Sequence, residues 1–295
     1  MATQITYNRE LNFEYGRVDA LSPLVRRVIA NNPSGFTFHG TGTYIIGHNQ
    51  VAIIDPGPDL GEHVDALLDA VRGETVSHIL VTHTHNDHSP AVRALQAATG
   101  APSYSYGPHG TRSEDGVSEG GADYDFSPDH LIGDGDIVTG NGWSIEALHT
   151  PGHCSNHLCF DLREESALLC GDHVMGWSTS IVSPPDGHMG SYMASLEKVG
   201  RHNAARYYPT HGAPIDDPKP YVKALLAHRH EREDQIIVEL GAGPATIEDM
   251  VPRMYSDVDP NLYTAAARSV LAHLIHMVDT GRVQVDRDVY RLMGG

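Results

Sequence analysis

Four side chains of the types that bind metal ions fall within the short run of residues 83–88. They are His83, His85, Asp87 and His88, in the pattern H-x-H-x-D-H. The run follows the apolar residues 79–81, which read as the end of a strand. No helix presents four side chains at this spacing on one face, whereas a loop at a strand end can turn alternate side chains towards two neighbouring ions. The run therefore indicates a metal-activated water, and hence a hydrolase.

Three further segments repeat this layout, in which a strand ends, a glycine or proline turns the chain, and a ligand-type side chain follows. These side chains are His153 in H-T-P-G-H, Asp172 in C-G-D-H and His211 in P-T-H-G. The strands expected before them cover residues 143–149, 167–170 and 205–208. Ligands gathered at one rim of a packed sheet sit on rigid supports, as a site of fixed geometry requires. The four segments together predict a single metal centre.

Hydrophobic patterning predicts an α/β arrangement of the elements that position these side chains. Further strands are expected over residues 43–46, 51–54, 77–82, 130–138 and 157–161, and helices over residues 62–71, 90–99, 191–200 and 218–240. Residues 107–129 are rich in glycine, serine and aspartate and show no periodicity, so they read as a mobile surface loop. From Gly107 to Asp136 there is one arginine against eight acidic residues, which makes this region locally negative.

The C-terminal part of the chain reads as a separate unit. Gly241-Ala242-Gly243-Pro244 is a plausible boundary, so we expect a catalytic domain over residues 1–240 and a C-terminal domain over residues 241–295. Two expected helices and a hairpin give the second domain a winged-helix-like order, over residues 246–255, 262–279 and 282–292. Five arginines against seven acidic residues are a poor match to the DNA backbone, so we expect a packing module and no DNA partner.

Composition sets wider limits on the function. The 295 residues carry 20 Lys plus Arg against 38 Asp plus Glu, a net charge of −18, which weighs against tight binding of a polyanion. The N-terminus lacks an apolar signal region, and no stretch reaches the roughly 20 apolar residues of a membrane span. We therefore expect a cytoplasmic protein with no membrane partner. Three cysteines do not fit a disulfide framework.

In these motifs the chain resembles the metallo-β-lactamase superfamily. The matched runs are T-H-T-H-N-D-H at 82–88, H-T-P-G-H at 149–153, C-G-D-H at 170–173 and P-T-H-G at 209–212, and the likeness covers roughly residues 20–235. The run His228-Arg229-His230-Glu231-Arg232-Glu233, followed by a winged-helix-like tail, is similar to the β-lactamase-like protein 2 group. Four motifs in order are a specific signal, whereas any one alone is weak.

The resemblance implies a four-layer αβ/βα sandwich with two divalent metal ions between the sheets. Carried over by position, the first ion takes His83, His85 and His153, the second takes Asp87, His88 and His211, and Asp172 bridges them. Asp87 and Asp172 are then the catalytic carboxylates, and Asp87 also orients the attacking water and accepts its proton. Five histidines and two aspartates suit Zn²⁺ best, and Mn²⁺ or iron fits the same donors.

The expected reaction is attack by a metal-bound hydroxide at a dinuclear site. We rank a small ester or thioester as the first substrate class and single-stranded RNA, cut by an endoribonuclease, as the alternative. β-Lactamase activity ranks third and only as a weak promiscuous activity. Dedicated lactamases of the superfamily generally lack an aspartate at the position of Asp172. Purely structural metals are disfavoured, since seven ligands for two ions leave coordination positions for water. The oligomeric state and the role of the C-terminal part stay open.

Overall fold

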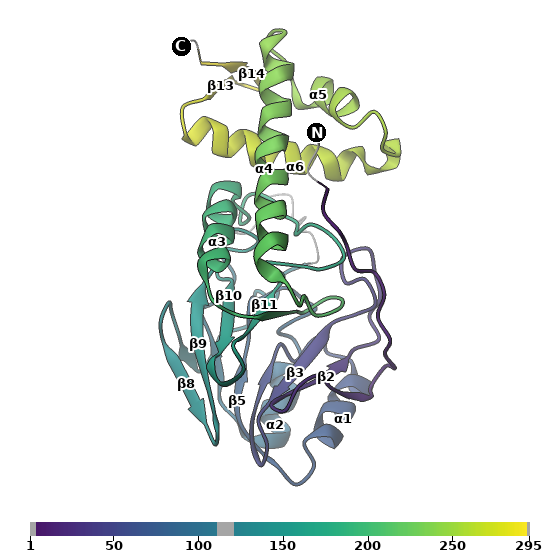
Figure 1. Ribbon diagram of the computed structural model, residues 1–295, viewed down its shortest axis with the longest axis vertical. Coiled ribbons are helices and arrows are strands. Elements are labelled where there is room, and N and C mark those ends of the chain that lie inside the picture. The colour runs from purple at the N-terminus through teal and green to yellow at the C-terminus, as the bar shows by residue number, and fades with distance from the viewer. Residues whose placement is uncertain (1–3, 111–120, 294–295) are drawn as a thin grey trace.

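Two β-sheets face each other in the structure, a computed structural model that describes residues 4–110 and 121–293 (Figure 1). The strand order is β1-β2-β3-β4-β5-β6-β7 in the first sheet and β12-β11-β10-β9-β8 in the second. The first sheet consists of β1 (Val18–Ala20), β2 (Val25–Ile29), β3 (Gly42–Ile46), β4 (Gln50–Ile54), β5 (Thr75–Leu80), β6 (Ser103–Ser105) and β7 (His130–Leu131). The second consists of β8 (Ile137–Gly140), β9 (Trp143–His149), β10 (Leu158–Leu162), β11 (Ala167–Gly171) and β12 (Arg206–Pro209).

Helices cover the outer face of each sheet. The apolar faces of α1 (Gly61–Ala70) and α2 (Val92–Thr99) pack against the first sheet. On the second sheet lie α3 (Met189–Arg201) and the first half of α4 (Pro218–Gly241). Side chains from both sheets form a shared core between them, with the aromatic rings of Tyr44, Phe160 and Tyr208 among its members. Because the central strands β3, β4, β10 and β11 are buried on both faces, they read as largely apolar runs. The predicted α/β sandwich is confirmed.

Parallel pairing brings the ends of several strands to one rim. β4 runs parallel to β5, where Ile54 aligns with Leu80. β11 runs parallel to β12, where Gly171 aligns with Pro209. β9 has the same direction as β11, because each pairs antiparallel with β10 between them. The loops that leave the carboxyl ends of these strands therefore start side by side, and they contain every predicted metal ligand.

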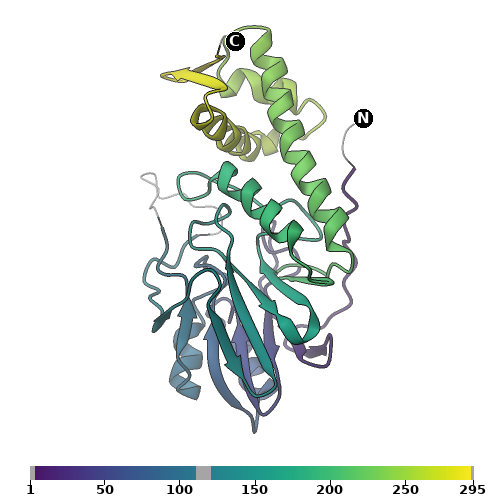
Figure 2. The ribbon, with the colours of Figure 1, turned by 60° about the vertical axis from the view of Figure 1, so that its left-hand side comes forward.

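The C-terminal module, defined here as residues 245–292, stands on the sandwich (Figures 1 and 2). It holds α5 (Ile247–Met254), α6 (Tyr263–Asp279) and the hairpin of β13 (Val283–Asp286) and β14 (Val289–Leu292). A capping box of Thr246 and Asp249 starts α5. The predicted winged-helix order is confirmed. The second half of α4 packs in the core of this module through Ile236 and Leu240. The predicted division at residue 240 stays a prediction.

Some elements differ from the sequence-based expectation. The strand expected over residues 130–138 is two strands in different sheets, β7 and β8, because the chain turns at Gly133 and Gly135, where the Gly133 amide bonds Asp136 Oδ2 at 2.7 Å. Three strands, β1, β2 and β6, were not predicted. β1 and β6 have only three residues each, and Arg26 and Arg27 interrupt the apolar pattern of β2.

The loop expected over residues 107–129 lies partly outside the described residues, which omit 111–120. Residues 121–129 contain no helix or named strand, as expected of a loop, but Phe126 is buried in the core beneath the first sheet and Asp123 is also buried. The Asp123 amide also donates to Thr84 O at 2.8 Å, next to the first motif. In the described part of the chain, no helix combines the length and the apolar character that a membrane crossing requires.

Candidate metal centre

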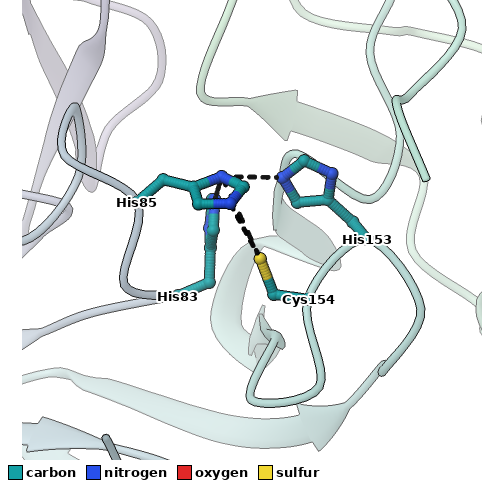
Figure 3. Close-up of side chains that lie close together, drawn as sticks. All are labelled: His83, His85, His153 and Cys154. Carbon is teal, nitrogen blue, oxygen red and sulfur yellow. Dashed lines mark hydrogen bonds between the residues drawn. The ribbon is translucent and has the colours of Figure 1, made fainter. Parts of the chain in front are cut away.

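Three imidazole nitrogens converge at the ends of β5 and β9 (Figure 3). His83 Nε2 lies 3.0 Å from His85 Nδ1, and His153 Nε2 lies 3.2 Å from that same His85 atom. The alternation of His83 and His85 along an extended loop turns one ε nitrogen and one δ nitrogen towards a common point. His153 reaches that point from the loop after β9, so two distant segments supply one group of donors.

A second group of donors lies beside the first. His211 Nε2 is 3.1 Å from Asp87 Oδ2, and His88 Nε2 is 3.6 Å from the same oxygen. Asp87 and His88 continue the loop that carries the first group, whereas His211 follows β12. These donor atoms are close enough together to hold one metal ion.

Asp172 joins the two groups. Its Oδ2 lies 3.7 Å from His153 Nε2 and 3.5 Å from His88 Nε2. Its Oδ1 lies 3.4 Å from His211 Nε2. The carboxylate therefore touches donors of both groups, and the structure brings all seven predicted side chains together in one place.

The donor atoms of this centre fit bound cations. His88 Nε2, His211 Nε2 and Asp172 Oδ1 are buried, and none has a hydrogen-bond partner among the described residues. Buried polar atoms without partners are rare in folded proteins and indicate a missing ion or water. Imidazole nitrogens with carboxylate oxygens are the ligands of zinc and of other divalent transition metals. The residues present therefore match the metals that the sequence predicted.

The carboxylate of Asp55 helps to orient the second group of donors. Its carboxylate accepts hydrogen bonds from the Thr82 amide and hydroxyl at 2.8 Å each, from His88 Nδ1 at 2.9 Å and from the Thr210 hydroxyl at 3.0 Å. Because Nδ1 is engaged by Asp55, Nε2 is the nitrogen of His88 that is directed at the centre. Asp55 is buried and ties together the ends of β4, β5 and β12, as expected of an acceptor that orients a ligand.

The outer nitrogens of two other histidines are held by backbone carbonyls. His153 Nδ1 donates to Ile181 O at 2.6 Å, and His211 Nδ1 donates to Gly40 O at 3.2 Å. Each bond fixes the tautomer and the ring plane, so that the ε nitrogen faces the centre. Ring orientation at this centre therefore depends on two loops that contribute no donor of their own.

Comparison with known proteins identifies the family. Residues 37–211, a span that contains all seven side chains, match the sequence model described as Metallo-beta-lactamase superfamily. The chain belongs to the metallo-β-lactamase superfamily. It is a hydrolase of that superfamily, and its residues 246–291 match the Beta-lactamase associated winged helix domain.

Relatives of this hydrolase include named thioesterases. The chain is 33% identical over 262 residues to "Atrochrysone carboxyl ACP thioesterase dmxR1" of Cryptosporiopsis sp., which covers 81% of this chain and 74% of that protein. It is 32% identical over 260 residues to "Lactamase-like protein ptaB" of Pestalotiopsis fici, which covers 83% of this chain and 76% of that protein.

Two solved structures share the fold of the hydrolase. A beta-lactamase domain protein from Burkholderia ambifaria superposes with a TM-score of 0.80 at 19% identity, over 98% of this chain and 97% of that one. A metallo-beta-lactamase family protein from Thermus thermophilus gives a TM-score of 0.74 at 22% identity, over 93% of this chain and 100% of that one. At these identities the likeness establishes the architecture, including the placement of the C-terminal module.

Two positions in the motifs of the hydrolase require glycine, because neighbouring atoms occupy the space that a Cβ would need. Gly171, just before Asp172, has φ +52°, and a Cβ there would lie 2.6 Å from His157 Nε2. That same nitrogen accepts a bond from the Asp172 amide at 3.2 Å, which holds the carboxylate towards the centre. Gly152 has φ +139°, and a Cβ there would lie 2.3 Å from the backbone of Tyr192 in α3. Only glycine fits either position.

Two side chains next to ligands are buried. Cys154 follows His153, and its Sγ lies 3.2 Å from His85 Nε2, the ring nitrogen opposite the one that meets His83 and His153 (Figure 3). Burial raises the pKa of this thiol, so it is neutral beside the ring. His173 follows Asp172 and is buried in the core against the ring of Tyr192, with a centroid distance of 5.0 Å.

Asn156 is a supporting residue that sequence reasoning missed. Its Nδ2 donates to Thr84 Oγ1 at 2.9 Å and to the carbonyls of Gly107 and Pro108 at 3.2 and 3.1 Å. It thereby links the first motif to a distant loop and to the H-T-P-G-H segment. An asparagine in a loop carries no spacing signal, and only the three-dimensional arrangement identifies this role.

Electrostatics separate the two groups of histidines. Burial lowers the pKa of His85 to about 3, and the neighbouring His153 contributes to this decrease. Burial would also lower the pKa of His211, but the carboxylates of Asp172 and Asp87 outweigh it and raise that pKa to about 10. The pKa of His88 is raised well above its usual value, against the effect of burial, by Asp87, Asp172 and Asp55. The histidines beside the carboxylates, His88 and His211, therefore hold protons much more tightly than His85 of the first group.

We expect metal uptake to release protons. In protein stripped with a chelator, protonated His211 stabilises the fold fully below the unfolded pKa of 6.5, and this contribution is lost as the pH rises towards about 10. Metal ions must displace the protons on His88 and His211, so the apparent metal affinity should rise between about pH 6.5 and 9. Titration calorimetry in two buffers of different ionisation enthalpy measures the release. An affinity that is flat over this range contradicts the expectation.

Proposed function

We propose that the protein hydrolyses a thioester at a centre of two divalent metal ions. The observation that carries this proposal is the convergence of seven donor side chains, with Asp172 in contact with both groups. Geometry of this kind supports an assignment of His83, His85 and His153 to one ion and of Asp87, His88 and His211 to the other. Zinc suits five imidazoles and two carboxylates best, and manganese or iron would find the same donors.

The chemistry divides between the ions and the chain. Two divalent ions, when bound, would supply an activated water near neutral pH and a positive charge for the carbonyl oxygen of the substrate. The Asp172 carboxylate, which contacts donors of both groups, would contribute a ligand to each ion. Asp87 accepts a hydrogen bond from the attacking water and so aims it. Burial would raise the pKa of Asp87, but His88 and His211 outweigh it and bring that pKa to about 2, so Asp87 stays ionised and acts as a hydrogen-bond acceptor.

The nature of the leaving group favours a thioester. A thiol has a pKa near 8.5 and leaves as a thiolate near neutral pH, with no acid needed to protonate it. An alcohol or an amine leaving group does need that acid. The carboxylates of the centre are ionised, and the raised pKa values of His88 and His211 belong to nitrogens that would bind metal. Among the described residues of the centre, no other side chain is placed to act as such an acid.

An aromatic surface beside the second group of donors is suited to bind an apolar acyl part of the substrate. The ring of Phe38 stacks on Trp177 with a centroid distance of 4.7 Å and an angle of 9°. Phe38 has φ +56°, a strained value for a bulky residue that often marks a functional position. Trp177 packs over Gly212, which follows His211, and Gly40 of the Phe38 loop binds the His211 ring. The stacked rings therefore lie where an acyl chain would enter.

The relatives named ACP thioesterases agree with this substrate class. We infer that the thiol part of the substrate is a pantetheine-type arm, either free or attached to a carrier. No observation favours RNA: the net charge of −18 would repel a polyanion, and the C-terminal module carries no excess of basic residues. β-Lactam opening stays a minor side activity in this proposal.

The proposal is tested with four substrates offered in parallel. They are an aromatic N-acetylcysteamine thioester, its matched oxygen ester, a single-stranded oligoribonucleotide and a cephalosporin. We expect the thioester to give the highest kcat/KM, EDTA to abolish its hydrolysis, and zinc to restore it at two equivalents per chain. Free thiol released per unit time is the measurement, and metal content by elemental analysis accompanies it.

Two outcomes would overturn the proposal. One is RNA cleavage that exceeds thioester hydrolysis, persists at about 200 mM salt and disappears with EDTA, because charge-driven nonspecific binding weakens at that salt. The other is thioester hydrolysis that continues unchanged in protein shown to contain no metal.

A further inference from the structure

Residues 178–188 link the end of the second sheet to α3 without regular secondary structure. This segment, called the 178–188 segment below, contains the carbonyl of Ile181 that accepts the 2.6 Å bond from His153 Nδ1. The position of this one peptide group therefore sets the ring orientation of His153. No strand or helix holds the peptide, so other contacts must do so.

Arg229 of α4 holds the neighbouring peptide. Its Nη2 donates to the carbonyl of Ser180, the residue before Ile181. Its guanidinium lies over the ring of Tyr192 at 5.2 Å, and the Tyr192 hydroxyl donates to His173 O at 3.1 Å. Arg229 is thereby fixed from two sides and is buried. Its helix, α4, lies beside α3 in the helical layer that covers the second sheet (Figure 1).

A buried arginine at this position would be unfavourable if its only role were to stabilise the fold. Arg229 forms no ion pair with any described carboxylate, and its Nε has no hydrogen-bond partner there. Removing a guanidinium from water carries a large desolvation cost, and apolar residues of similar volume often stabilise such positions better. The bond to Ser180 O is the specific interaction that an apolar residue would not supply.

The C-terminal module anchors both α4 and the 178–188 segment. Glu233, one turn after Arg229, is buried and pairs with Arg282 at 2.7 Å, and His273 Nδ1 lies 3.7 Å from it. Arg268 of α6 donates to Ser183 Oγ at 3.4 Å, and Asp279 contacts His188 Nε2 at 3.1 Å. These contacts place the module on the segment that supports His153.

We propose that Arg229 is a positioning residue for His153, acting through the Ser180–Ile181 peptide, and that the C-terminal module serves to hold this arrangement in place. The proposal rests on the metal centre of the proposed function, although not on its substrate. Arg229 touches neither a donor atom nor the space between the two groups. Its effect should therefore fall on the retention of metal by the first group and on kcat, rather than on KM.

The test compares Arg229→Met, Arg229→Lys and the control Arg232→Met in zinc-loaded protein. Arg232 lies on the same helix, over the ring of Tyr255 at 4.6 Å, and donates to Gln235. We expect the half-life of the more weakly held zinc ion in EDTA to fall by about 10- to 100-fold in Arg229→Met, the range typical of lost support for a ligand. Arg229→Lys should recover part of this loss, because an ammonium group can still reach Ser180 O.

Several results would decide against the proposal. A lower unfolding temperature in Arg229→Met with zinc half-lives equal to those of Arg232→Met would mean a structural role only. If Arg229→Met does not fold, Arg229→Gln replaces it, because its shorter side chain has no cationic donor for Ser180 O, and a zinc half-life equal to that of Arg232→Met would overturn the proposal. Wild-type protein that takes up no zinc would instead contradict the metal centre itself, so the two failures are distinguishable.

Discussion

Replacing Asp172 by asparagine should lower kcat/KM for thioester hydrolysis by roughly 10³-fold, because the lost electrostatic contribution is several kcal/mol and each 1.36 kcal/mol is a factor of ten. Asp172 is the side chain whose oxygens contact donors of both groups, at 3.4 to 3.7 Å. Asparagine keeps the shape but removes the charge and one acceptor, so two ions would repel each other with less compensation. Zinc content should fall from two ions per chain towards one.

A matched control separates this effect from a general loss of negative charge. Asp216 is largely exposed and pairs with Arg206 at 2.6 Å, away from the motifs. Asp216→Asn should keep both ions and the wild-type rate. An Asp172→Asn protein that is fully loaded and fully active would show that the carboxylate does not join the two ions.

Replacing Asp55 by alanine should produce the largest loss of stability. The change leaves the Thr82 amide, the Thr82 and Thr210 hydroxyls and His88 Nδ1 without their shared acceptor. Hydroxyl groups can rotate to other partners, but the amide and the imidazole cannot. An unsatisfied buried donor costs about 1–3 kcal/mol, so we expect a decrease of about 2–6 kcal/mol in the free energy of unfolding. Urea unfolding of metal-stripped protein measures it.

The same variant should also bind metal less tightly. Loss of the partner that orients a histidine ligand typically lowers metal affinity by about 10- to 100-fold, here at the group of Asp87, His88 and His211. Asp69→Ala is the matched control, since Asp69 is exposed and its carboxylate pairs with the equally exposed Arg72, and it should change stability by less than about 0.5 kcal/mol. Equal unfolding free energies for the two variants would show that Asp55 does not support the centre.

Much of the metal centre could be predicted because its ligands lie in short motifs of neighbouring residues. Each ligand follows an apolar run that ends in glycine, proline or a polar turn, and β5, β9, β11 and β12 are those runs. The glycine, proline and polar residues that end each run mark where the chain leaves the sheet. The helices of the sandwich and of the C-terminal module lie within a few residues of their expected positions, because their apolar residues keep helical spacing.

Supporting contacts could not be predicted, because they join residues far apart in the chain. Nothing in the spacing of Ser180 and Arg229 indicates that a carbonyl and a guanidinium meet. The direction of Cys154 depends on how one loop turns after His153, which the residue types leave open. The turn between β7 and β8 moves the chain from one sheet to the other, and this depends on pairing with strands that are distant in sequence.

One continuous helix connects the two cores of the protein. The first half of α4 packs Val222 and Leu225 beside the second sheet, while Ile236 and Leu240 pack with the helices of the C-terminal module. A helix advances about 100° per residue. Inserting a single residue between these halves would rotate the module about the helix axis and move Arg268 and Asp279 away from Ser183 and His188. The length of α4 is thus under a geometric constraint that an exposed surface loop does not face, since even a whole added turn would displace the module by about 5.4 Å along the axis.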